Sequence, residues 1–96
     1  MALEKPRKSV KARITGRVQG VSFRVWTLRE AERLELSGWV RNEPDGSVAA
    51  LFHGPEDAVA DMLDRLWRGP AGAVVAAVDF DDVEMDEAPV RFVITG

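Results

Sequence analysis

The chain has 96 residues, enough for one compact domain. It contains no cysteine, which excludes disulfides, thiolate metal sites and a cysteine nucleophile. No apolar run approaches the roughly 20 residues that a membrane-spanning helix needs, so we predict no membrane partner and a cytoplasmic location.

The N-terminal residues are charged and lack the apolar core of a secretory signal. We predict a disordered tail over residues 1–8 and a folded domain over residues 9–96. The net charge of -3 is unevenly spread: residues 1–42 hold ten Lys and Arg against four Glu, and residues 43–96 hold three Arg against twelve Asp and Glu. Attraction of an anionic ligand explains this asymmetry as well as charge pairing within the fold does.

The first half of the chain predicts a strand and then a helix. Residues 9–17 alternate between apolar and polar side chains, which is typical of a half-buried strand. Residues 23–34 carry one apolar stripe at helical spacing, with Ser22 as the candidate N-cap. Glycine is the usual residue after a helix end, but here that position falls to Glu35, which would carry strain of about 1 kcal/mol in a left-handed conformation.

The second half predicts a hairpin, a helix and two strands. Strands over residues 36–42 and 47–53 flank the turn signal Pro44-Asp45-Gly46. A helix opens near Pro55 and ends at Gly69-Pro70. Residues 74–83 read as a strand, and a short last strand starts at Val90. We place Trp26 and Trp67 in the core and leave Trp39 partly exposed.

This order of elements is β-α-β-β-α-β plus a short terminal strand. It indicates the α+β class and a ferredoxin-like fold, the split βαβ arrangement. We expect an antiparallel sheet with both helices on one face.

The loop over residues 16–24 joins the first strand to the first helix and reads Gly-Arg-Val-Gln-Gly-Val-Ser-Phe-Arg. Its two glycines allow positive φ and close approach of the backbone to a ligand. Successive N–H groups in such a turn form a nest for an anion, and the following helix adds its own free N–H groups and partial positive charge. Arg24 can donate two parallel hydrogen bonds to phosphate or carboxylate oxygens. The loop therefore predicts an oxyanion cradle suited to phosphate.

A second segment, Gly38-Trp39-Val40-Arg41-Asn42, is followed at fixed spacing by Gly46, Val48 and Gly54. Together with the loop 16–24 it closely resembles the two signatures of the acylphosphatase family, and the resemblance extends over residues 10 to about 94. It implies a five-stranded antiparallel sheet with two helices on one face. It also implies hydrolysis of an acyl phosphate to a carboxylate and inorganic phosphate, without a metal or another cofactor.

The resemblance also assigns roles to residues. Arg24 would be the catalytic arginine that binds phosphate, and Asn42 would orient the attacking water. Backbone N–H groups for the substrate would come from Gln19, Gly20, Val21, Ser22, Phe23 and Arg24. The chain departs from the family at Glu35, where glycine is common, and at Thr95-Gly96, which replaces a bulkier or basic ending and bears on how Arg24 is held.

The same chemistry is reasonable without the family. An acyl phosphate has a carboxylate leaving group whose conjugate acid has a pKa of roughly 4, so it departs without a general acid. Phosphoryl transfer has a loose transition state with charge on three oxygens. An arginine, a ring of N–H groups and an amide that holds water therefore suffice.

Each candidate also has a plainer interpretation. Asn42 alone is most often a turn residue, and Ser47 either supports Asn42 or simply starts a strand. His53 is expected to be structural. The acidic residues 79–87 suggest a metal site, but alternation favours a solvated sheet edge that deters strand pairing.

Other functions use the same order of elements. A metal-carrying domain would need a Cys-x-x-Cys pair, and an RNA-recognition domain would need aromatic residues on the third strand, so we expect no metal and no nucleic acid partner. A non-catalytic phosphate- or nucleotide-binding module stays open, as does a domain for carbamoyl phosphate handling, although the latter usually belongs to a longer chain with zinc-finger cysteines. We expect a monomer that binds an acyl phosphate and is inhibited by its product, inorganic phosphate.

Overall fold

The computed structural model describes residues 6–96. Residues 1–5 of the predicted tail lie outside this part of the chain, and the first strand begins at Arg7, two residues before the predicted start. The elements are β1 Arg7–Arg17, α1 Phe23–Arg33, β2 Ser37–Asn42, β3 Val48–Pro55, α2 Glu56–Leu66, β4 Val74–Asp82 and β5 Phe92–Ile94. The predicted order of elements is confirmed.

The five strands form one sheet in the order β4-β1-β3-β2-β5. The pairs β4–β1, β1–β3 and β3–β2 are antiparallel, as predicted, but β5 pairs parallel to β2. The prediction of a purely antiparallel sheet is therefore wrong. Strands β4 and β5 are the two edge strands of the sheet. A single loop over residues 83–91 joins them, so β5 begins at the same end of the sheet at which β4 finishes. This makes β5 antiparallel to β4 and hence parallel to β2, which alternation along the strand cannot reveal.

The last strand is also shorter than predicted. It begins at Phe92, whose ring is buried and stacks on Phe52 with centroids 5.5 Å apart. Val90, the predicted first strand residue, is 96% exposed. Its apolar side chain fits the alternating pattern, but the loop places it beyond the end of the sheet.

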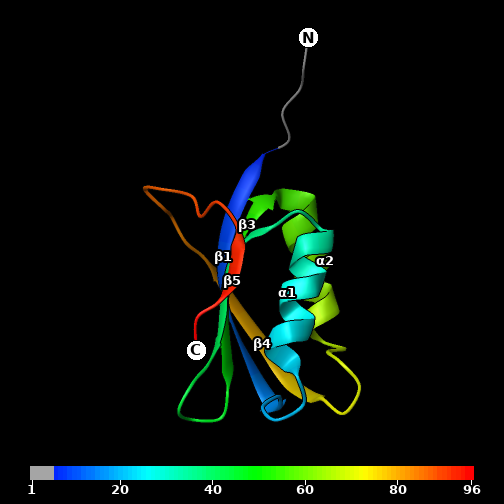
Figure 1. The fold of residues 1–96 in the computed structure, drawn as a ribbon. Coiled ribbons are helices and arrows are strands. Elements are labelled where there is room, and N and C mark those ends of the chain that lie inside the picture. Colours follow the sequence, from blue (N-terminus) through cyan, green and yellow to red (C-terminus); the bar gives the residue numbers. More distant parts are fainter. Residues whose placement is uncertain (1–5) are drawn as a thin grey trace.

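Both helices cover one face of the sheet, as Figure 1 shows, and the core lies between the two layers. Strand residues of alternating position supply its sheet side, and residues such as Phe23, Met62 and Leu66 supply its helix side. Trp26 packs partly buried against this core, but Trp67 is 53% exposed, so its predicted core position is wrong. The reason is that α2 ends at Leu66, and the stripe does not continue to the next residue.

At the end of α1, Glu35 adopts the left-handed conformation whose cost the sequence analysis considered. Glu35 has φ 57°, its N–H donates to the carbonyl of Glu32 at 3.0 Å, and the N–H of Leu36 donates to the carbonyl of Ala31 at 2.9 Å. This pair of hydrogen bonds is the Schellman motif, in which glycine is the usual left-handed residue. Glu35 is not glycine, so in this conformation it carries strain of about 1 kcal/mol.

Among residues 6–96, no helix is both long and apolar enough to span a membrane. No three His, Asp or Glu side chains among them are grouped to hold a metal ion, and the acidic residues Asp79, Asp81 and Asp82 lie exposed on the edge strand β4.

Candidate active site

The anion loop, as we call residues 18–22, leaves β1 through a bend at Gly16. The pairing of β1 with β4 shifts register between Thr15 and Gly16. Gly16 has φ 121°, and a Cβ atom there would lie 2.2 Å from the carbonyl oxygen of Val74. Only glycine fits this close approach, so the sequence itself fixes where the strand turns into the loop.

Two left-handed residues shape the anion loop. Gly20 has φ 76° and Ser22 has φ 63°. Within the described part of the chain, the backbone N–H groups of residues 19–22 donate no hydrogen bond. Left-handed residues alternating with ordinary ones turn successive N–H groups toward one side of the chain, so these free donors form an anion-binding nest.

Ser22 is the N-cap residue of α1, as predicted, but its side chain makes no capping hydrogen bond. A capping serine normally adopts an extended conformation, whereas Ser22 is left-handed. The first turn of α1 therefore keeps free N–H groups beside those of the loop.

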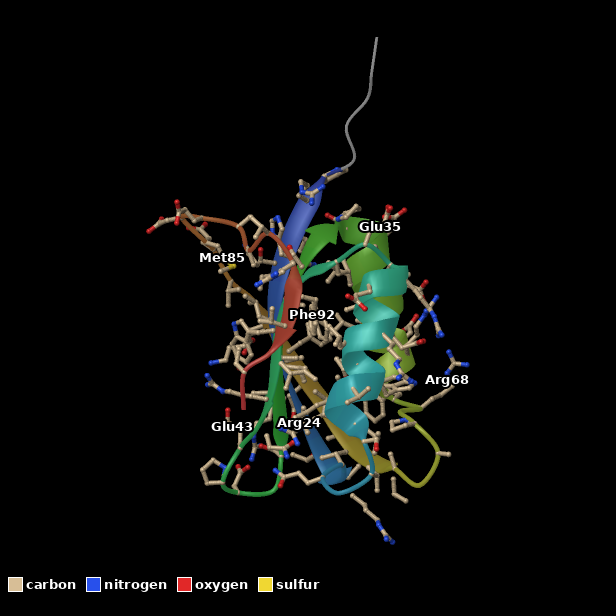
Figure 2. All side chains as sticks on the ribbon, in the orientation of Figure 1. Arg24, Glu35, Glu43, Arg68, Met85 and Phe92 are labelled. Atoms are coloured by element: carbon tan, nitrogen blue, oxygen red, sulfur yellow. The ribbon has the colours of Figure 1, made fainter. Side chains whose placement is uncertain are left out.

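Arg24 lies in this first turn, at the foot of α1, where Figure 2 shows it beside the β2–β3 hairpin. Its Nη1 atom donates a hydrogen bond to the main-chain oxygen of Gly96. The same oxygen accepts from the backbone N–H of Asn42 at 3.3 Å, and Thr95 N–H donates to the carbonyl of Val40 at 3.0 Å. The chain segment after β5 thus anchors Arg24 and the end of β2 at one point. The other guanidinium donors of Arg24 make no hydrogen bond to any residue from 6 to 96.

A pocket of about 450 Å³ joins these parts. Its lining consists of Val18, Gly20, Ser22, Phe23, Arg24, Val25, Asn42 and Ile94. The Asn42 side chain forms no hydrogen bond to any described residue, so its amide is available to water or a ligand in the pocket. The structure therefore brings Arg24 and Asn42 together on one cavity beside the anion loop.

Two of the predicted substrate-binding residues do not line this pocket. Val21 packs against the hydrophobic core with its side chain, and the Gln19 side chain bonds to the hairpin. The backbone N–H groups of both residues donate no hydrogen bond to a described residue, so they stay available for the predicted role of donors to the substrate.

A larger hollow of about 660 Å³ lies on the other side of the sheet from the helices. Its arginines are already paired: Arg13 with Asp45, and Arg41 with Glu43. Since this hollow offers neither a free arginine nor free backbone N–H groups from a loop, it is a poorer anion site than the pocket at Arg24.

Ser47 supports the hairpin turn and makes no side-chain bond to Asn42. Its hydroxyl and its N–H both donate to Asp45 Oδ1, at 2.6 and 2.9 Å. These hydrogen bonds, and the guanidinium of Arg13 beside them, hold the pKa of Asp45 well below its usual range. The turn that follows Asn42 is therefore internally braced.

His53 lies away from the pocket, in β3. Its Nδ1 atom is 2.6 Å from the hydroxyl of Ser9 on the neighbouring strand β1. Burial, and then the charge of Arg7, lower the pKa of His53 below its ordinary value. This position agrees with the structural role expected for it.

Sequence reasoning did not identify two contacts of the site. It expected the Thr95-Gly96 ending to bear on how Arg24 is held, but not that the main-chain oxygen of Gly96 accepts from both Arg24 and Asn42. The second contact is that of the side-chain amide of Gln19, which donates to the carbonyls of Glu43 and Ser47. Both contacts join residues far apart in the sequence, and no local pattern signals them.

Comparison with known proteins gives one consistent result. The acylphosphatase family model matches residues 10–94. An acylphosphatase from Rhizobium meliloti is 58% identical over 93 residues, covering 97% of this chain and 98% of the relative. Among solved structures, the acylphosphatase of Bacillus subtilis has a TM-score of 0.88 and 33% identity and covers 92% of this chain and 98% of its own. That of Coxiella burnetii has a TM-score of 0.88 and 30% identity, with 93% of each chain covered.

Proposed function

Because this chain belongs to the acylphosphatase family, we propose that it hydrolyses acyl phosphates to a carboxylate and inorganic phosphate. The observation that carries this proposal is that Arg24 and Asn42 line one pocket together with Gly20 and Ser22 of the anion loop, whose N–H groups donate no hydrogen bond to a described residue. A positive side chain and several N–H donors suit a phosphoryl group, and a neutral amide beside them suits a water molecule.

The anion loop and Arg24 hold the phosphoryl group of the substrate. The loop N–H groups and the free guanidinium donors of Arg24 bind its non-bridging oxygens, where charge is spread in the loose transition state. The hydrogen bond from Nη1 to Gly96 fixes the guanidinium plane, so little orientational freedom is lost when substrate binds.

Asn42 positions the nucleophile. Its side-chain carbonyl accepts a hydrogen bond from a water molecule, or its NH₂ group donates one to the water oxygen, and this oxygen then attacks phosphorus opposite the leaving carboxylate. The bond from phosphorus to water oxygen forms as the bond to the acyl oxygen breaks, and the acyl group leaves as a carboxylate. No side-chain base is needed, because a loose transition state demands little of the nucleophile and a phosphate oxygen takes the proton.

Three further features belong to the proposal. The reaction needs no metal ion, inorganic phosphate is both product and competitive inhibitor, and the protein acts as a cytoplasmic monomer. The support for the first is chemical: Arg24 and the N–H groups supply the charge stabilisation that a metal ion provides elsewhere. The support for phosphate inhibition is that phosphate fits the same donors as the substrate's phosphoryl group.

Turnover of benzoyl phosphate in excess EDTA tests the proposal. We expect saturable hydrolysis, competitive inhibition by inorganic phosphate and a rise in melting temperature with phosphate, since it binds only the folded chain. Saturable phosphate binding without turnover would instead identify a non-catalytic phosphate-binding module. A melting temperature that does not change with phosphate would contradict phosphate binding by the anion loop and Arg24.

A further inference from the structure

The side-chain amide of Gln19 spans the neck of the hairpin turn, which we define as residues 43–47. Its Nε2 atom donates to the carbonyl oxygen of Glu43 at 2.8 Å and to that of Ser47 at 2.9 Å. Glu43 N–H also donates to Ser47 O at 2.8 Å, and Gly46 N–H to Glu43 O at 3.1 Å. The turn is therefore closed by its own bonds. Gln19 adds a connection from outside.

This connection joins the two halves of the proposed site. The backbone of Gln19 belongs to the anion loop, and Glu43 directly follows Asn42. The distance between bound phosphate and a water on Asn42 thus depends on how the loop and the turn are held together. We propose that the Gln19 side chain is a positioning residue that sets this distance, an inference that rests on the proposed function.

The chemistry of the contact suits an amide. Both partners are carbonyl oxygens, which only accept hydrogen bonds, and a single NH₂ group supplies two donors from one atom. An ionised carboxylate at this position has no donor for the two carbonyl oxygens, and an apolar side chain forms no hydrogen bond with them. The second link between the two halves, from Arg24 and Asn42 to Gly96, does not touch the anion loop upstream of the helix. It leaves Gln19 as the direct brace between loop and turn.

Gln19→Met tests the hydrogen bonds at nearly constant side-chain volume. A displacement of about 1 Å of reacting groups can lower a rate by about a hundredfold, so we expect kcat for benzoyl phosphate to fall by about tenfold to a hundredfold. The inhibition constant of phosphate should change by no more than about threefold, because the backbone N–H groups and Arg24 remain. A phosphate inhibition constant that rises as much as kcat falls would overturn the proposal, since Gln19 would then build the cradle. A kcat within about twofold of wild type, with the fold intact by its melting curve, would overturn it as well.

Gln19→Glu adds a readout in pH. The ionised carboxylate faces two carbonyl oxygens and cannot donate, whereas the protonated form donates one hydrogen bond. The two carbonyl oxygens and the partial burial of this position disfavour the ionised form, so we expect a pKa above the ordinary value of about 4.3 for this carboxyl. The ratio of its kcat to that of Gln19→Met should therefore rise as pH falls through this raised pKa. A ratio that is flat with pH would contradict the donor role.

Nuclear magnetic resonance supplies a readout that does not depend on activity. Gln19 is the only glutamine in the sequence and Asn42 the only asparagine, so the side-chain NH₂ region contains two pairs of signals. Gln19→Met removes one pair and thereby assigns the other to Asn42. We expect the Asn42 pair to shift in this variant and to respond less to phosphate. An Asn42 pair that keeps its wild-type position and response would overturn the inference.

These experiments distinguish a failure of the inference about Gln19 from a failure of the proposed function. If the wild-type protein fails to hydrolyse benzoyl phosphate, the proposed function fails, while the Asn42 signals still decide whether Gln19 positions the turn. If the wild type is active and Gln19→Met matches it, the inference about Gln19 alone fails.

Discussion

Replacement of Asn42 by alanine separates the positioning of water from the binding of phosphate. In the structure its side chain makes no hydrogen bond to a described residue, and its backbone N–H, which binds Gly96 O, survives the change. Truncation therefore removes little that stabilises the fold. What it removes is the hydrogen bond to water in the transition state.

The expected magnitude follows from that single interaction. Losing one positioning hydrogen bond in a transition state costs about 3 kcal/mol, which corresponds to about a hundredfold in rate. We expect kcat to fall by this amount while the phosphate inhibition constant stays within about threefold, because Arg24 and the anion loop are untouched. The melting temperature should stay close to that of the wild type.

The assay is steady-state hydrolysis of benzoyl phosphate with and without inorganic phosphate, accompanied by a melting curve. Asn42→Asp is the matched comparison: it keeps the shape but places a negative charge beside the phosphoryl group, so it should weaken phosphate binding as well. If Asn42→Ala weakened phosphate inhibition as much as it lowered kcat, Asn42 would be a substrate ligand. If it changed neither quantity, the catalytic role of Asn42 would be refuted.

The other predictions concern single residues of the site and the fold. Arg24→Lys should lower kcat/KM by at least about a hundredfold and should weaken phosphate inhibition. The reason is that one ammonium group cannot bind Gly96 O and the phosphate oxygens in fixed geometry. Near wild-type kinetics would contradict this. Glu35→Gly should raise the free energy of unfolding by about 1 kcal/mol in urea titrations, since glycine adopts φ 57° without strain, and an unchanged or lower value would count against strain there. The folded state favours neutral His53, so its share of stability is present above about pH 6.5 and is lost as pH falls below it. The free energy of unfolding should therefore fall less between about pH 7.5 and pH 5.5 in His53→Gln than in the wild type, and equal losses would refute a role for His53.

Local patterns predicted the elements well because they act within a few residues. Alternation predicted the strands, helical stripes predicted α1 and α2, and the position after α1 that a left-handed glycine usually takes was read as Glu35. The signatures around Arg24 and Asn42 predicted a shared site, and the structure places both on one pocket. Their catalytic roles remain proposals.

Features that depend on tertiary arrangement were beyond local reasoning. The parallel pairing of β5 follows from the path of the 83–91 loop around the sheet, and Val90 is exposed because the strand begins two residues later. Exposed Trp67 shows that an apolar stripe does not say where the covering layer ends. The bonds of Gln19 to the hairpin turn join residues 24 and 28 positions apart, a separation at which sequence pattern carries no signal.

Hydrolysis in water enriched in oxygen-18 tests the central claim most directly. If water held by Asn42 attacks a phosphoryl group held by Arg24 and the anion loop, mass spectrometry of a single turnover of benzoyl phosphate should find one labelled oxygen in inorganic phosphate and none in benzoate. Label in benzoate would mean attack at the acyl carbon and would contradict the account.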